Sequence, residues 1–361
     1  MNKILYVCTN SDFAGAPRHT ASLINFFSKN FEVRGIFGGQ GEIKKILQDQ
    51  NTEVISELQS KINIKKDWRS FLKLKEAINK FKPDIVHVHS FKASLLIRCI
   101  CMFSSIKVIY TVHGWPWRGK NFLVASLSYI LEVMFAIFDK STNYVFVDPL
   151  SKSFWPIRLF VSKKKLILNG IESPNIDTKI YTKQKDNPNF MFVSRVSPGK
   201  RHDIAIKAFE LYCKNGGSGS LHFIGENTNS EKFLNLFKKL SYHSKDYVYF
   251  HGAISQLEKI YSIGDVVILI SDFEAMPLSL IEGLSYQKPL IASDVGGVYE
   301  IVDESNGILL SKNSIKETYM AFKAMESKTD RVNLSKNARL KYEEKFCIEK
   351  MHSKLQLLYE S

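Results

Sequence analysis

The second half of the chain contains two cations whose spacing suits a phosphorylated ligand. Arg195 and Lys200 lie in the segment RVSPGK, directly after the apolar run Phe190–Ser194. An arginine fork and a lysine point charge suit a pyrophosphate, and they would also neutralise the charge that grows on a departing nucleotide. Two cations at this spacing, taken alone, are more often unconnected surface residues. The pair therefore gains weight only together with other ligand-binding residues.

Two glutamates lie eight positions apart in the segment that follows the apolar run Val266–Ile270. Because Pro277 suits the first turn of a helix, Glu274 should lie in the loop that enters this helix and Glu282 about a turn and a half along it. A nucleotide sugar along this helix end would meet Glu282 with its ribose and Glu274 with its hexose. Its diphosphate would face the free N–H groups of the helix start. An isolated pair of this kind is more often two solvated surface glutamates.

Two further candidates follow apolar runs in the first half. Gly15 lies in the segment TNSDFAGAP before a helix, where a glycine lets the backbone approach a ligand. His113, in the segment TVHGW, could bond to a sugar hydroxyl or steady positive charge near a reacting carbon. A lone glycine or histidine is more often structural, and we interpret His87 and His89 as structural. The first loop is not a G-x-G-x-x-G fingerprint, which argues against a nicotinamide-dependent dehydrogenase.

The sequence predicts no metal site. It contains no D-x-D pair that would hold a metal against a diphosphate, and its histidines and five cysteines show no metal-ligand spacing. The cysteines form no C-x-x-C pair, and the N-terminal apolar stretch of five residues is too short for a signal peptide. We therefore expect a metal-independent protein without a cofactor, located in a reducing cytoplasm.

Apolar runs of strand length alternate with longer helical segments along the whole chain. Such runs fit strands that are buried on both faces of a parallel sheet, and their alternation with helices, twice over, predicts two doubly wound α/β domains. A polar segment without periodicity, residues 170–188, separates the two series. The predicted strands are Ile4–Cys8, Val33–Phe37, Ile85–Val88, Lys107–Thr111, Tyr144–Val147, Leu166–Leu168, Phe190–Ser194, Leu221–Ile224, Val248–Phe250, Val266–Ile270, Leu290–Ala292 and Ile308–Leu310.

The charge of the chain is concentrated in its first half. Residues 1–180 contain 26 Lys and Arg against 14 Asp and Glu, a net charge of +12, whereas residues 181–361 contain 24 against 22, a net charge of +2. This asymmetry indicates that the first domain faces something anionic. No nucleic-acid recognition signature is present, so an anionic membrane surface is the favoured partner and a generally lysine-rich composition is the alternative.

The basic charge is densest in residues 61–82, where eight Lys and Arg interleave with apolar side chains. The apolar residues Phe71, Leu74, Ile78 and Phe81 recur at helical spacing, so this helix has one apolar face and one cationic face. The apolar face packs either on lipid or on the sheet of its own domain, and the sequence leaves both possibilities open.

The segment Phe122–Phe138 is long and apolar. It is at the short limit for a transmembrane span, and Glu132 interrupts it with a carboxylate that is costly inside a bilayer. We therefore expect a buried domain helix, with a helix that dips into the membrane interface as the alternative.

The order of these motifs resembles family four of the retaining GT-B glycosyltransferases. The matching motifs are His-Gly after an N-terminal strand, N-G-I at the domain junction, R-x4-K, E-x7-E and S-D-V-G-G. The resemblance covers nearly the whole chain and is strong from Phe190 to Leu310. It implies an α/β GT-B fold with two Rossmann-like, doubly wound domains facing a central cleft. Residues 1–172 would bind the acceptor, residues 187–342 the nucleotide sugar, and a final helix at 343–361 would pack back on the first domain.

The resemblance also implies roles for single residues. Arg195 and Lys200 match the family's pyrophosphate cations, Glu282 matches its ribose ligand, and Glu274 matches the carboxylate beside the donor sugar. His113 matches the donor-sugar histidine, and Gly15 matches the N-terminal glycine loop. The backbone that cradles sugar and phosphate would belong to Ala275, Met276, Pro277, Leu278 and Ser279. The sequence departs from the family pattern at Ala275-Met276-Pro277, where Gly-Phe-Pro is usual, and at Ala16, where a second glycine is usual.

The implied function is the retaining transfer of a hexose or N-acetylhexosamine from a nucleotide-diphosphate sugar, with UDP favoured. The acceptor would be lipid-linked or a polysaccharide, as in lipopolysaccharide and other bacterial surface glycan biosynthesis. The enzyme would be peripheral on the inner face of the cell membrane and would not bind nucleic acid. Two alternatives stay open: a nucleotide-sugar epimerase or hydrolase on the same fold, and a catalytically inactive peripheral membrane-binding protein.

Overall fold

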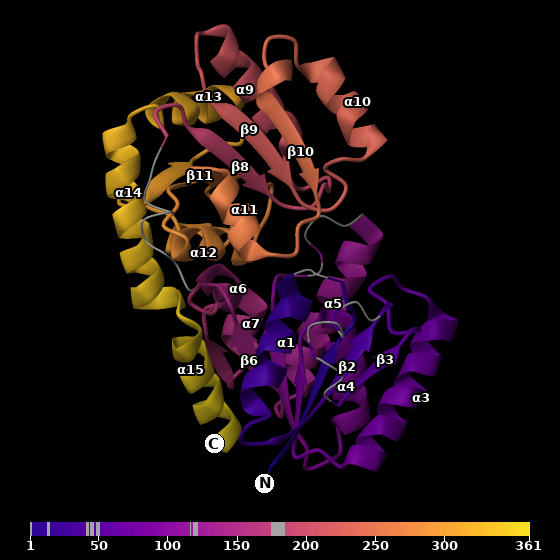
Figure 1. Ribbon diagram of the computed structural model, residues 1–361. Coiled ribbons are helices and arrows are strands. Elements are labelled where there is room, and N and C mark those ends of the chain that lie inside the picture. The colour runs from indigo at the N-terminus through magenta and orange to yellow at the C-terminus, as the bar shows by residue number, and fades with distance from the viewer. Residues whose placement is uncertain are drawn as a thin grey trace. The chain divides into compact units, whose positions relative to one another are not determined.

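The computed structural model describes residues 2–12, 15–40, 43, 47, 51–115, 117, 122–174 and 185–361. The chain divides into two compact units (Figure 1). Unit 1 contains Met1–Asn169 together with Met351–Ser361, and unit 2 contains Gly170–Lys350. The division falls at the start of the polar segment 170–188, of which residues 175–184 lie outside the described residues.

Unit 1 is built on a sheet of seven parallel strands in the order β3-β2-β1-β4-β5-β6-β7. The order reverses between β1 and β4, and open α/β sheets bind ligands at the carboxyl edge beside such a reversal. The strands are β1 (Lys3–Cys8), β2 (Glu32–Gly38), β3 (Thr52–Ile55), β4 (Ile85–Val88), β5 (Lys107–Val112), β6 (Asn143–Phe146) and β7 (Lys164–Leu166). The helices are α1 (Gly15–Phe27), α3 (Ile64–Phe81), α4 (Phe91–Cys101), α5 (Phe122–Phe138), α6 (Pro149–Ser153), α7 (Trp155–Phe160) and α15 (Ile348–Glu360).

The C-terminal segment is part of the core of unit 1. The Tyr359 hydroxyl lies 3.0 Å from the Tyr6 hydroxyl and 2.7 Å from His87 Nδ1. The ammonium of Lys107 donates to the carbonyl oxygen of Leu358 at 2.6 Å. These buried polar contacts tie α15 to β1, β4 and β5, so residues at the two ends of the sequence stabilise one domain.

Unit 2 is built on a sheet of six parallel strands in the order β10-β9-β8-β11-β12-β13. The order reverses between β8 and β11, which is the arrangement of a nucleotide-binding, doubly wound fold. The strands are β8 (Asn189–Val193), β9 (Ser220–Ile224), β10 (Val248–Gly252), β11 (Val266–Leu269), β12 (Leu290–Ser293) and β13 (Gly307–Leu310). The helices are α9 (His202–Lys214), α10 (Glu231–Leu240), α11 (Leu257–Ile263), α12 (Leu278–Ser285), α13 (Ile315–Ala324) and α14 (Lys328–Lys341).

The two parallel α/β sheets confirm the predicted fold class, and every apolar run that was predicted as a strand forms one, except Leu166–Leu168. Of that run, only Leu166 lies in a strand, as the last residue of β7. The strand β3, at the edge of the first sheet, was not predicted, because its sequence contains no continuous apolar run. Only Ile55 of this strand is buried, and Glu53 is exposed. A half-exposed edge strand does not need a continuous apolar sequence, so the criterion of an apolar run could not detect it.

The apolar face of α3 that is formed by Phe71, Leu74, Ile78 and Phe81 packs on its own domain. Leu74, Ile78 and Phe81 belong to the hydrophobic core of unit 1, and Phe71 is half-buried. Of the two possibilities that the sequence left open for these four residues, the structure shows the contact with the domain. The exposed apolar residues of α3 are Ile64, Trp68 and Leu72.

The expectation that α5 is a buried domain helix is wrong for its apolar residues. Its buried positions are Ser128, Glu132 and Ala136, whereas its large apolar side chains are mostly exposed or half-exposed. The sequence suggested burial because of its composition, but the small and polar residues are the ones that face the domain. None of the helices in the described part of the chain is long and apolar enough to cross a membrane.

Candidate donor site

The carboxyl ends of β8 and β11 lie side by side at the centre of the unit 2 sheet. Open α/β sheets bind ligands at this point. Two backbone contacts hold the loop after β8 against the end of β11: Asp272 N–H donates to the carbonyl oxygen of Gly199 at 2.9 Å, and Lys200 forms a bridge with Ser271. The segment RVSPGK is therefore fixed beside the segment that carries Glu274.

Lys200 and Glu274 form an ion pair at this edge of the sheet. The ammonium of Lys200 contacts Glu274 Oε1, and the two side chains are 22% and 12% exposed. The sequence assigned both residues to the donor but did not predict that they pair, because 74 positions separate them. A partly buried pair of this kind keeps both charges satisfied while no ligand is bound.

Arg195 lies two positions after the end of β8, and its side chain is exposed. The backbone beside it is held by the loop after β9, where Val196 N–H donates to the carbonyl oxygen of Glu226 at 2.9 Å. Gly225 makes this close approach possible, since its φ is +141° and a Cβ would lie 2.2 Å from the carbonyl oxygen of Ser194. Gly225 directly follows the predicted strand Leu221–Ile224, which is the signal that could have identified it as a functional glycine.

The S-D-V-G-G segment supports the backbone of Glu274 and Ala275. Gly297 N–H donates to the carbonyl oxygen of Ala275 at 2.8 Å. Gly296 has a φ of +60°, and a Cβ there would lie 1.7 Å from the carbonyl oxygen of Glu274. Only glycine fits this contact, so the motif fixes the loop that presents the Glu274 carboxylate.

The predicted backbone cradle leads into α12. The side chains of Met276 and Pro277 are buried, whereas Ala275, Leu278 and Ser279 are half-exposed. Pro277 is the N-cap of α12, one position earlier than predicted, and no side chain caps this helix start. N–H groups of a first helical turn have no intrahelical acceptor, and together with the helix dipole they attract an anion.

Glu282 lies on the second turn of α12 and is buried, with 2% of its surface exposed. The expectation for an isolated pair, two solvated surface glutamates, is therefore wrong for this residue. The Tyr261 hydroxyl contacts Glu282 Oε2 at 2.8 Å and the carbonyl oxygen of Ser279 at 3.0 Å. Tyr261, which the sequence did not single out, thereby links the Glu282 carboxylate to the start of the helix.

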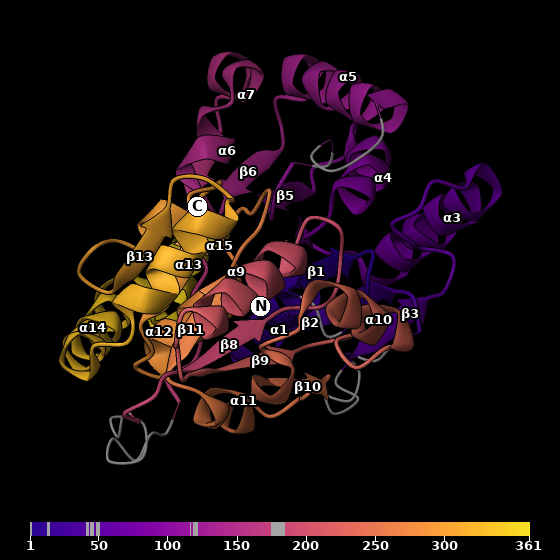
Figure 2. The same ribbon diagram turned by 90° about the horizontal axis from the view of Figure 1, so that it is seen from above.

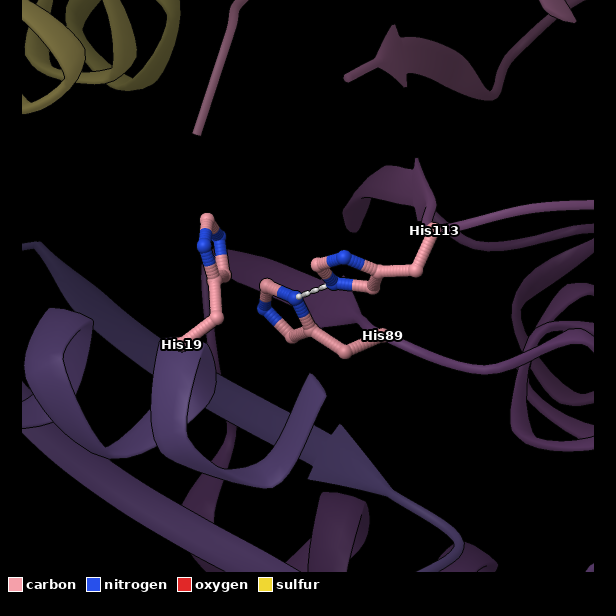
Figure 3. A group of neighbouring side chains, drawn as sticks. All are labelled: His19, His89 and His113. Carbon is pink, nitrogen blue, oxygen red and sulfur yellow. Dashed lines mark hydrogen bonds between the residues drawn. The ribbon is translucent and has the colours of Figure 1, made fainter. Parts of the chain in front are cut away.

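Three histidines gather at the carboxyl edge of the unit 1 sheet. His113 follows β5, His89 follows β4, and His19 lies on α1; Figure 3 shows their three rings together. His89 Nδ1 lies 3.3 Å from His113 Nε2, and the ring centroids of His19 and His113 are 4.9 Å apart. The interpretation of His89 as a purely structural residue missed this contact with the predicted donor-sugar histidine.

Burial keeps these imidazoles neutral. It lowers the pKa of His113 to about 4 and that of His87 to about 3. The pKa values of His19 and His89 are also well below the ordinary value, first because of burial and then because of the neighbouring imidazoles. His113 can therefore accept or donate a hydrogen bond to a sugar hydroxyl as a neutral ring, without adding a positive charge.

The ligand atoms of His19, His89 and His113 all lie within 4.8 Å of one another, so this group could hold a metal ion. The absence of a histidine cluster, inferred from the spacing of the histidines in the sequence, is therefore wrong. Sequence spacing could not reveal the group, because its three residues lie on three different elements. Only the order of strands β1, β4 and β5 brings them together.

Gly15 is the first residue of α1 and is exposed. Residues 13–14 of the preceding loop lie outside the described residues. The approach of a ligand to the Gly15 backbone stays a prediction. Gly15 and His113 belong to unit 1, whereas the other predicted site residues belong to unit 2.

We expect the His113 ring to titrate near pH 4, far below the value of about 6.5 for a free histidine. Because the pKa is lowered, the ring stays neutral while the pH is lowered from about 8 to about 5, and it gains a proton only below that range. An NMR titration of the ring protons measures this directly, with His113→Gln to assign the signal. A midpoint near 6.5 would contradict the burial of this ring.

Both halves of the chain match known protein families. Residues 13–162 match the model described as Glycosyltransferase Family 4, and residues 175–341 match the model described as Glycosyl transferases group 1. A UDP-Gal:alpha-D-GlcNAc-diphosphoundecaprenol alpha-1,3-galactosyltransferase from Escherichia coli is 26% identical over 355 residues, covering 92% of this chain and 89% of that protein. The Escherichia coli O-antigen biosynthesis glycosyltransferase WbnH is 24% identical and covers 86% of each chain.

The fold is shared with solved glycosyltransferase structures. The Anabaena protein HepE in complex with UDP and glucose has a TM-score of 0.81 and 15% sequence identity, with 100% of both chains covered. This likeness confirms the GT-B fold. The two family models together span both units, and the chain belongs to the group 1 glycosyltransferases that carry a family 4 domain in their first half.

Proposed function

We propose that this glycosyltransferase transfers a hexose or N-acetylhexosamine from a UDP-sugar to a lipid-linked or polysaccharide acceptor in bacterial surface glycan synthesis. The observation that carries the proposal is the Lys200–Glu274 pair at the reversal point of the unit 2 sheet, beside the start of α12. The names of the relatives support the substrate class, since one uses UDP-galactose and a diphosphoundecaprenol-linked acceptor, and HepE binds UDP and glucose.

The donor would separate the Lys200–Glu274 pair. Its diphosphate takes the ammonium of Lys200 and the guanidinium of Arg195, and its sugar hydroxyls donate to the carboxylate of Glu274. Both partners exchange a protein charge for a ligand group of matching polarity, so neither is left buried and unpaired. The ribose lies against Glu282, one turn further along α12, and the first-turn N–H groups face the phosphates.

The transfer would retain the configuration of the sugar through attack on the same face from which the nucleotide leaves. The bond between the sugar C1 and the phosphate oxygen breaks, and the acceptor oxygen forms the new bond to C1. The acceptor's proton passes to the leaving phosphate oxygen, so no protein base is required. Arg195 and Lys200 stabilise the charge that develops on the diphosphate, and neutral His113 bonds to a donor-sugar hydroxyl.

The proposed location is the inner face of the cell membrane, without a metal or cofactor and without nucleic acid. The net charge of +12 on residues 1–180 supports an anionic membrane partner for the acceptor-binding domain. The diphosphoundecaprenol acceptor of the Escherichia coli relative supports a lipid-linked acceptor.

Product analysis with and without an acceptor tests the proposed function. Purified protein is incubated with UDP-glucose, UDP-galactose and their N-acetylated forms, alone and with a polyprenyl-diphosphate sugar. The proposal expects a new anomeric linkage with the donor's configuration, formed only when the acceptor is present. Turnover of the donor alone into an epimer or a free sugar would assign the chain to the epimerase or hydrolase alternative.

The two glutamates should have separable effects on binding and turnover. Glu282→Gln should weaken UDP binding by about tenfold or more, since a hydrogen bond to a charged group contributes about 1.5–3 kcal/mol. Glu274→Gln should leave UDP affinity unchanged or higher, because it frees Lys200, but should lower kcat. Calorimetric titration with UDP and steady-state kinetics measure the two quantities. Tyr261→Phe, which keeps the Glu282 carboxylate, is the matched control and should lose less affinity.

Transfer activity should survive an excess of EDTA, because Arg195 and Lys200 supply the charge that a metal would otherwise supply. The measurement is the initial rate before and after chelation. Loss of activity that magnesium or manganese restores would contradict the cation-only account of the donor site. Restoration by zinc alone would instead point to the group of His19, His89 and His113.

A further inference from the structure

The exposed face of α5 is an uninterrupted apolar stripe. Leu123, Leu127, Ile130, Met134 and Phe138 follow one another at helical spacing, and their side chains are 78%, 49%, 54%, 50% and 75% exposed. An ordinary surface helix carries charged and polar residues on this face. We call these five residues the α5 stripe.

The opposite face of α5 carries the only charge of the helix. Glu132 is 1% exposed and receives both Nη atoms of Arg98, at 3.2 and 2.8 Å. The Tyr144 hydroxyl donates to the same carboxylate at 2.7 Å, and Ser128 and Ala136 are buried beside it. The polarity of the helix is thus inverted: a polar anchor holds it to unit 1, and an apolar surface faces outward.

Aromatic side chains border the stripe. Tyr129 of α5 lies 5.4 Å from the ring of Trp117 and 5.7 Å from that of Phe154, and all three are half-exposed. The short helix α7 packs on α5 (Figure 2). Its residue Leu159 is 63% exposed. Amphipathic Trp and Tyr rings beside an apolar surface are typical of the boundary between lipid head groups and acyl chains.

Positive charge gathers directly after the stripe. Residues 139–165 contain six Lys and Arg against two Asp. Asp148 is buried, and Asp139 binds the hydroxyls of Ser141 and Thr142. The exposed cations of this segment are Lys140, Arg158, Lys163 and Lys165. A surface of this composition complements the head groups of anionic lipids.

From these observations we propose that α5 lies in the surface of an anionic lipid bilayer, with the α5 stripe among the acyl chains and the cations of residues 139–165 at the lipid phosphates. The occupant is a bilayer because an apolar stripe that is followed in the chain by exposed cations complements both the acyl chains and the anionic head groups of lipids. The inference deepens the membrane part of the proposed function. It places the insertion on α5, since Leu74, Ile78 and Phe81 of α3 belong to the hydrophobic core of unit 1.

Vesicle co-sedimentation of the full chain tests the stripe. The vesicles contain phosphatidylcholine alone or with about 30% phosphatidylglycerol, at low and high salt. The wild type should bind the anionic vesicles and should be released only in part by salt, because salt screens the cations but not the apolar contact. The variant Leu127→Gln/Ile130→Gln/Met134→Gln should bind at least tenfold more weakly. Its exposed substitutions should leave the thermal midpoint unchanged.

A matched variant separates insertion from simple charge attraction. Replacing Lys65, Lys66, Arg69 and Lys73 of α3 with glutamine removes four cations but leaves the α5 stripe intact, so most of the vesicle binding should persist. Equal binding by the wild type and the α5 variant would overturn the proposal, as would loss of binding in the α3 variant alone. A wild-type dimer that the α5 variant converts to a monomer, without lipid binding by either, would assign the stripe to a second copy instead.

The same variants keep this inference distinct from the proposed transfer reaction. UDP affinity and transfer to a short-chain acceptor should be equal in the wild type and the α5 variant. Arg195, Lys200, Glu274 and Glu282 belong to unit 2, and the proposed site residues of unit 1, Gly15 and His113, do not lie on α5. Vesicle binding without any transfer would refute the proposed function and support the α5 inference. Transfer without vesicle binding would support the proposed function and refute the α5 inference.

Discussion

Replacing Lys200 with alanine should lower kcat/KM for sugar transfer by about 30- to 1000-fold, equivalent to about 2–4 kcal/mol of transition-state stabilisation. In the proposed donor site, the ammonium would face the diphosphate at the moment when negative charge accumulates on it. The substitution has a second consequence, since the Glu274 carboxylate loses the partner that it contacts in the structure. An uncompensated carboxylate beside the diphosphate would repel the donor, so UDP affinity should fall as well.

Arg195→Ala should have an effect of the same order on kcat/KM, because the arginine supplies the second cation for the diphosphate. The thermal midpoint of the variant, measured alongside the kinetics, shows whether a loss of transfer comes from the missing cation or from a loss of stability.

Arg201→Ala is the matched control for both variants. Arg201 lies next to Lys200 in the sequence, but it pairs with Asp203 at 3.0 Å and with Asp272 at 3.2 Å. Its loss should change transfer little, because these contacts serve the loop and not the donor. If all three variants keep wild-type kinetics while folded, the pyrophosphate assignment is wrong. If Arg201→Ala is as damaging as Lys200→Ala, general loosening of the loop explains the loss.

The double variant Lys200→Ala/Glu274→Gln separates the two consequences of removing Lys200. Glutamine removes the uncompensated negative charge, so UDP affinity should recover relative to Lys200→Ala. The rate of transfer should not recover, since the cation that stabilises the leaving diphosphate is still missing. Recovery of both quantities would show that Lys200 acts only through Glu274.

The fold could be predicted because parallel strands that are buried on both faces require continuous apolar sequence. Strands such as β4 and β11 are buried at every position, so burial and sequence carry the same information. The strand β3 shows the limit of this argument. Its edge position needs only one buried side chain, and the sequence TEVI leaves no apolar run to recognise.

The donor site was only partly predictable. The positions of Lys200 and Glu274 after two strands were readable, but their contact depends on the neighbouring position of β8 and β11, which local spacing does not encode. The histidine group has the same origin, since His19, His89 and His113 come from separate elements. Gly296 had a readable signal: a glycine pair after a strand is unusual unless a backbone needs a positive φ or a close approach.

The burial of the apolar residues of α5 was wrongly predicted from the high total hydrophobicity of the segment. The spacing of its small and polar residues indicates which face is buried. Ser128, Glu132 and Ala136 are spaced four positions apart and so mark a single narrow face. A carboxylate in the middle of that face indicates a buried ionic partner when the remaining faces are apolar. The partner itself, Arg98 on α4, could not be identified from the sequence, because any of the basic residues of the first domain could have satisfied the same requirement.

Glu132→Ala should destabilise unit 1 by about 3–5 kcal/mol, which is the range for breaking a buried ion pair. Arg98 is fully buried, and its other hydrogen bonds are with the Tyr144 hydroxyl at 2.6 Å and with the Ser94 side chain and backbone. Its guanidinium also lies over the Phe135 ring, 4.2 Å from the centroid. None of these groups carries a negative charge at neutral pH, so the guanidinium would be left uncompensated in the core. Hydrogen exchange at the amides of β5 and β6 measures the change within unit 1 and does not depend on the unfolding of unit 2.

Two further variants distinguish this cost from a general effect of altering α5. Arg98→Met/Glu132→Leu removes both charges and keeps apolar volume, so it should be much more stable than Glu132→Ala, because a well-packed apolar pair can replace a buried ion pair at little cost. Met134→Ala, on the exposed face, should change stability by no more than about 0.5 kcal/mol. If Glu132→Ala costs no more than Met134→Ala, the buried pair does not hold α5 to the domain. The outward orientation of its apolar stripe, on which the membrane contact depends, would then lose its physical cause.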